Sequence, residues 1–109
     1  MTATLLDVAT VTFMITSFDD FPIHQSERPV AATATGDPNH YDRYFFNGYS
    51  ADGSTFFAAA MGLYPNRHVI DASFSVVHKG EQVNVHATAR APRDRAQCMS
   101  VGPVAIEVV

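Results

Sequence analysis

The amino-acid sequence predicts an all-β fold, an antiparallel meander of about six strands. Two successive hairpin patterns fill the stretch from Tyr44 to Arg90, with β-branched and aromatic residues in the arms and a glycine at each tip. No stretch shows the 3.6-residue apolar period of an amphipathic helix. A chain of 109 residues is long enough for one modest core, so we expect a single domain spanning residues 1–109.

The first hairpin pattern has Asp52-Gly53 at its tip, two residue types that tolerate the positive φ of a tight two-residue turn. This turn pairs Tyr49 with Phe56 and Asn47 with Ala58. Both faces of the hairpin are then apolar or small, as in strands that are buried on both sides. Gly48 and the neighbouring alanine row indicate a close contact, either with another sheet or with a flat ligand.

The second hairpin pattern has one apolar and one polar face, and aligning the apolar faces pairs Val76 with Val83 across a Lys79-Gly80 turn. The polar face then brings together the candidate proton-handling residues Asp71, His86 and Arg90, with Ser73 opposite His86. Such a cluster inside a barrel could protonate an alkene or orient a carbonyl. The alternative is a solvent-facing surface with one weak ion pair.

The remaining segments are simpler. Thr4 to Thr16 is rich in Val, Thr, Ile and Phe and is expected to form a strand, and Val30 to Thr35 a short one. Residues 91–100 read as a polar loop. Residues 101–109 alternate like a strand, with Pro103 near its start, where a missing N–H is tolerated.

The corner between the hairpins, Tyr64-Pro65-Asn66, is rigid because proline fixes its own φ and favours an extended residue before it. Such a corner at a barrel mouth could gate a ligand. It could equally be only a turn in which the Asn66 side chain satisfies backbone groups. The candidate ligand-binding residues are therefore Asn47, Tyr64, Asn66 and His86.

Composition excludes several function classes. The net charge is −4 and no basic stripe is present, which argues against binding nucleic acid. Cys98 is the only cysteine, so no internal disulfide can form, and we expect a reducing, cytoplasmic location. The apolar N-terminal run contains Asp7 and lacks a preceding positive residue, so it predicts neither a signal peptide nor a membrane span. No metal spacing among the five histidines and no phosphate- or dinucleotide-binding motif is present, so no cofactor or metal is expected.

Several motifs carry a resemblance to a known family: DDFPIHQ, DRYFFNGY, GLYPNRHVIDASFSVVHKGEQ and ATARAPRDR. They resemble a large actinobacterial family that is similar to the lipocalin-like carotenoid hydratase and AttH superfamily. The resemblance covers residues 17–109 and implies calycin-type β-barrels in tandem, within a longer chain. Characterised members of that superfamily hydrate carotenoid double bonds or cyclise polyketide-like substrates in a largely apolar cavity. None of their catalytic residues matches a position here.

Three functions follow as hypotheses. The leading one is a lipocalin-like domain that binds a hydrophobic small molecule, such as a lipid, an isoprenoid or a polyketide-like compound. The others are part of a hydratase or cyclase, or a structural half-barrel that supports a site elsewhere. Because a closed barrel of this type takes about eight strands, an edge of this chain is expected to remain unpaired. We therefore expect an N-terminal fragment of a tandem-barrel protein, or a short gene product. It would self-associate through a β-edge, be completed by further C-terminal strands, or be only marginally stable.

Overall fold

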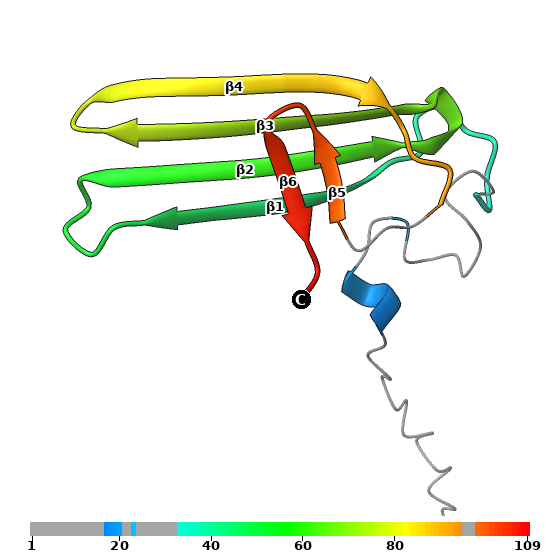
Figure 1. The fold of residues 1–109 in the computed structure, drawn as a ribbon, viewed down its shortest axis with the longest axis horizontal. Helices are drawn as coiled ribbons and strands as arrows, with labels where there is room; N and C mark the ends of the chain where they lie inside the picture. The colour runs from blue at the N-terminus through cyan, green and yellow to red at the C-terminus, as the bar shows by residue number, and fades with distance from the viewer. Residues whose placement is uncertain (1–16, 21–22, 24–32, 95–97) are drawn as a thin grey trace, which may run out of the picture.

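The computed structural model describes residues 17–20, 23, 33–94 and 98–109, and the all-β prediction is confirmed (Figure 1). Within these residues there is no α-helix, and no helix is long and apolar enough to cross a membrane. The elements are η1 (Ser17–Asp20), β1 (Asp42–Tyr49), β2 (Thr55–Tyr64), η2 (Pro65–Arg67), β3 (Val69–His78), β4 (Glu81–Arg90), β5 (Cys98–Val101) and β6 (Val104–Glu107), where η denotes a short 3-10 helix.

The strands form two antiparallel sheets. The larger is a meander in the order β1-β2-β3-β4, and the smaller is the hairpin β5-β6. Figure 1 shows the small hairpin lying across one face of the large sheet, nearer to the end where η2 turns the chain. We call this the corner end of the sheet, and the opposite end, with the turns after β1 and β3, the tip end. The described strands do not close into a barrel.

The predicted strand register is confirmed in both hairpins of the large sheet. Tyr49 lies opposite Phe56 in the first hairpin, and Val76 lies opposite Val83 in the second. Asn47 pairs with Ala58, as predicted. Since side chains alternate along a strand, this register fixes which residues share each face of the sheet.

The two tips differ from each other. Lys79 and Gly80 have φ values of 49° and 83°, so they form the expected tight turn with two positive-φ residues. The turn after β1 is longer than expected. Its closing pair is Ser50 and Thr55, whose backbone groups are joined by a hydrogen bond of 2.9 Å, and within this loop only Gly53 has a positive φ. The Asp52 carboxylate instead accepts hydrogen bonds from both serines of the loop.

The C-terminal region corrects the predicted boundaries. A strand, β5, begins at Cys98 where a loop was expected, and the single strand expected over 101–109 is interrupted by a turn at Gly102-Pro103. Gly102 has a φ of 56°, which a two-residue hairpin turn requires at its first position. The prediction missed that Gly-Pro is itself a turn signal.

The predicted strand over Thr4–Thr16 lies outside the described residues, as does most of the one over Val30–Thr35. The described part of the latter, residues 33–35, is not a strand. These residues instead lie beside the corner, where the Thr33 hydroxyl donates to the Asn66 side chain at 2.9 Å.

The core lies where β5 and β6 cover the large sheet. We call the covered side of the sheet its inner face and the other side its outer face. The buried hydrophobic side chains gather at the corner end, on the inner face and on the segments that cover it: Ile23, Met61, Leu63, Ile70, Ala72, Met99 and Val101. Beside them, partial burial and the nearby Asp20 and Asp42 raise the pKa of the Tyr44 phenol above its ordinary value. The neutral Tyr44 hydroxyl donates to the Asp20 carbonyl at 2.8 Å.

Candidate functional site

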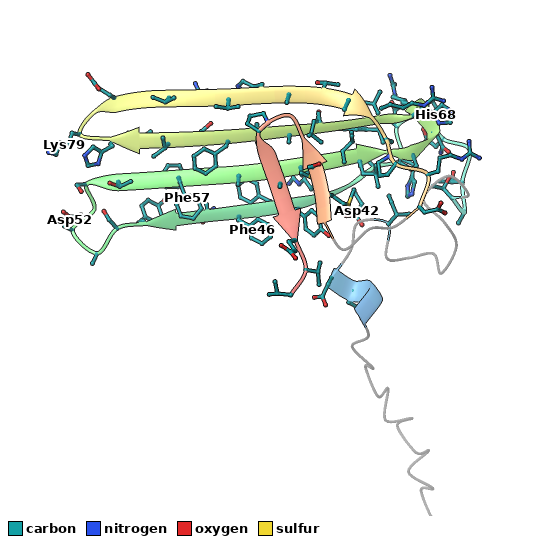
Figure 2. All side chains as sticks on the ribbon, in the orientation of Figure 1. Asp42, Phe46, Asp52, Phe57, His68 and Lys79 are labelled. Carbon is teal, nitrogen blue, oxygen red and sulfur yellow. The ribbon has the colours of Figure 1, made fainter. Side chains whose placement is uncertain are left out.

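An apolar groove of about 680 Å³ lies on the inner face, between β6 and the tip half of the large sheet. Its floor is formed by side chains of β1 to β4, and one wall is formed by β6 with the turn before it. Figure 2 shows Phe46 and Phe57, which belong to this floor, on neighbouring strands. The residues lining the groove are Phe46, Phe57, Ala59, Phe74, Val85, Pro103, Val104, Ala105, Ile106 and Glu107.

Three phenylalanines supply the floor because the register places them on one face. Phe57 and Phe74 are roughly parallel, with ring centroids 6.2 Å apart, and Phe46 is 49% exposed. The Phe57 ring lies over Gly48, where an added Cβ would come within 2.6 Å of a ring carbon. The expected close approach at Gly48 is therefore made by a side chain of the protein itself.

The groove offers mainly apolar contacts to a bound molecule. Among the described residues that line it, Glu107 is the only ionisable one, and its floor offers exposed aromatic faces that water solvates poorly. Within the described residues, no group of three metal-ligating side chains comes together anywhere. The groove can thus hold an apolar molecule, and its described lining residues form no array of acids and bases.

The predicted proton-handling residues lie on the other side of the sheet. Asp71, His86 and Arg90 project from the outer face, where His86 and Arg90 are exposed and Asp71 is half-buried over Gly62. The predicted pairing of Ser73 with His86 is confirmed, and both line a shallow depression of about 180 Å³ with Asp71. No described segment covers this depression, so the cluster faces outward.

The predicted ligand-binding residues do not gather at the groove either. Asn47 and His86 are exposed on the outer face, on strands at opposite edges of the sheet. Tyr64 and Asn66 lie at the corner end, far along the sheet from the tip half. The structure therefore separates these four residues instead of forming one site from them.

The corner itself is a hydrogen-bonded clamp. The Asn66 amide donates to the carbonyls of Thr35 and Asp37 at 2.7 and 2.8 Å. Arg67 donates to the Pro38 carbonyl and to Asn39. The Tyr64 ring stacks on Tyr41, with centroids 5.4 Å apart, beside an open hollow of about 510 Å³. These contacts match the alternative in which Asn66 satisfies backbone groups.

A comparison with protein-family models matches residues 15–109 to a family described as a family of unknown function, DUF8625. The match covers both sheets and the groove. The chain belongs to the DUF8625 family. No curated protein and no solved structure matched the chain.

For this DUF8625 chain, sequence reasoning missed the groove although part of the signal was present. The apolar face predicted for the second hairpin includes Phe74 and Val85, and it extends to Phe46 and Phe57 once the two hairpins are joined. The sequence did not reveal that β6 would form a wall above only half of that face. Locating the groove requires this wall.

Proposed function

We propose that this chain is part of a lipocalin-like domain that binds a hydrophobic small molecule in the inner-face groove. The observation that carries the proposal is the exposed phenylalanine floor facing an apolar strand across about 680 Å³. This volume lies within the roughly 300–1,000 Å³ that small-molecule sites occupy. The resemblance to the carotenoid hydratase superfamily points to the same ligand classes: lipids, isoprenoids and polyketide-like molecules.

The charge around the groove favours a neutral ligand. Glu107 is the one charged residue among those described around the groove, and the chain carries a net charge of −4. A ligand carboxylate placed beside Glu107 would be repelled at short range. A neutral isoprenoid alcohol would avoid this repulsion and retain the same contact with the phenylalanine rings. We therefore expect retinol to bind more tightly than palmitate.

The test is a fluorescence titration of the full chain with retinol, alongside native mass spectrometry of lipids that co-purify with it. Phe46→Ser removes a ring from the groove floor, and Phe45→Ser is its matched control. The two residues are neighbours on β1, on opposite faces, with similar exposed fractions of 49% and 53%. Losing one aromatic contact should raise the Kd for retinol about tenfold in Phe46→Ser. The control should stay within about twofold of wild type.

Two results would contradict the proposal. One is a full-length chain that carries no apolar molecule and binds neither retinol nor palmitate. The other is an equal loss of affinity in both variants, which would place the ligand away from the groove. A reaction dependent on Asp71 or His86 would instead support the hydratase or cyclase hypothesis, and His86→Gln tests this without altering the groove.

A further inference from the structure

Strand β1 is an edge strand whose side chains are typical of an interior strand. It is the first strand of the large sheet, and it carries aromatic side chains on both faces. On the outer face, Phe45 and Tyr49 are 53% and 75% exposed. Natural edge strands are usually protected by charges, prolines or bulges, because an unprotected edge recruits another strand. In β1 the charges, Asp42 and Arg43, are confined to the first two positions.

The backbone of β1 leaves a regular row of hydrogen-bonding groups at this edge. The Ser50 N–H donates to Thr55 on the β2 side. Alternation along an antiparallel strand therefore directs the N–H and C=O groups of Phe45, Asn47 and Tyr49 away from β2. No described strand pairs with them. The Arg43 N–H also faces this edge, but it already donates to the Asp42 carboxylate at 2.8 Å.

The chain before β1 is anchored next to the same edge. The Asp20 carbonyl accepts the Tyr44 hydroxyl, and the Ile23 N–H donates to the Asp42 carboxylate at 2.8 Å. Ile23 itself is 1% exposed within the core. Figure 1 shows η1 on the β1 side of the large sheet. These contacts hold Asp20 and Ile23, and with them the end of η1, beside the first residues of β1.

We propose that the segment Thr4–Thr16 pairs antiparallel with β1 as a fifth strand of the large sheet. Its composition favours a strand, and its only charged residue is Asp7. An extended chain covers about 3.3 Å per residue, so this segment is long enough to span all of β1. Because the segment is followed directly by η1, which is held beside the first residues of β1, a paired segment would run opposite to β1.

The pairing would account for the aromatic character of β1. The segment carries apolar residues at both alternating sets of positions, including Val8, Met14, Val11 and Phe13. Such a strand places apolar side chains beside those of β1 on both faces. It would satisfy the outward backbone groups and shelter Phe45. The inference concerns the edge and does not depend on a ligand in the groove.

The test is amide hydrogen exchange on the full chain, read by NMR at Phe45 and Asn47. The double variant Val11→Pro/Thr12→Pro removes two adjacent N–H groups, one of which would face β1. The matched control, Thr2→Pro/Ala3→Pro, lies outside the segment. Exchange at Phe45 and Asn47 should be at least about tenfold faster in the first variant than in wild type or the control.

Three results of the exchange experiment would overturn the proposal. They are rapid exchange at Phe45 and Asn47 in wild type, protection that weakens on dilution, and protection that the proline pair leaves unchanged. Dilution dependence would assign the edge to a second copy of the chain. If the proline pair also accelerates exchange at the core amides of Met61 and Leu63, the variant has lost its fold. The exchange rates of wild type then test the proposal alone. Hα–Hα nuclear Overhauser contacts between the segment and β1 support the pairing, and their absence overturns it.

Discussion

The two ends of the inner face are built from the same strands but are buried very differently. At the corner end, Leu63 of β2 is 0% exposed, and at the tip end Phe57 of the same strand and face is 38% exposed. Both belong to one alternating apolar row. The difference is that Ile23, β5 and β6 cover only the corner end. An alternating pattern therefore identifies a face of the sheet that can be buried. Which part of that face is actually buried depends on the elements that pack on it.

The largest expected effect comes from comparing Leu63→Ala with Phe57→Ala. Leu63→Ala empties a packed site and should lower the free energy of unfolding by about 2–5 kcal/mol. Phe57→Ala removes a larger side chain but from a partly solvated position, so its cost should be less than half of that. Urea denaturation measures both. An equal cost would show that the tip end is covered in solution, and the comparison would fail.

A smaller effect is expected from the clamp at the corner. Asn66→Ala removes the hydrogen bonds to Thr33, Thr35 and Asp37, and should cost about 1–3 kcal/mol. The matched control is Asn84→Ala, at an exposed site on β4 where the side chain accepts one bond from Gln82. The control should stay within about 0.5 kcal/mol of wild type by thermal unfolding. A changed retinol affinity with unchanged stability would instead make Asn66 part of a ligand gate.

The smallest effect is expected at the tip. The hydrogen bond from the Ser50 side chain, and to a smaller extent those from Ser54, lower the pKa of Asp52 from 3.8 to about 2. Because the folded pKa is depressed, the stabilisation is present above pH 3.8 and is lost as the pH falls towards 2. The amide shifts of Gly53 and Ser54 should follow this titration in acid. The same amide shifts should show no transition in the Asp52→Asn variant. A transition that persists in this variant would come from the titration of another group.

The register of the large sheet could be predicted because it follows from local patterns. Val76 and Val83 align two apolar faces, and this single pairing also fixes Ser73 opposite His86. The faces of the first hairpin were also assigned correctly, although its tip is longer than predicted. Asp52 was expected to adopt a positive φ, but it remains in an ordinary conformation and accepts hydrogen bonds from its neighbours.

The candidate site could not be predicted, because it depends on packing between segments that are distant in sequence. Nothing in Val104 or Ile106 indicates which face of the sheet the β5-β6 hairpin covers. The polar cluster of Asp71 and His86 was identified correctly as a shared face, but a pattern does not tell whether such a face lines a cavity. In the described residues it faces outward, and the apolar face forms the groove.

The meander topology has a consequence for how the chain reaches this structure. Among the described strands, each pair joins neighbours in the sequence, so each of these pairings closes only a short loop and costs little chain entropy. Such local pairing gives a low contact order for an all-β protein, which favours fast folding. The long-range step is the docking of β5 and β6, with Ile23, on residues of β2 and β3. The entropic cost of folding is therefore concentrated in the step that also creates the groove.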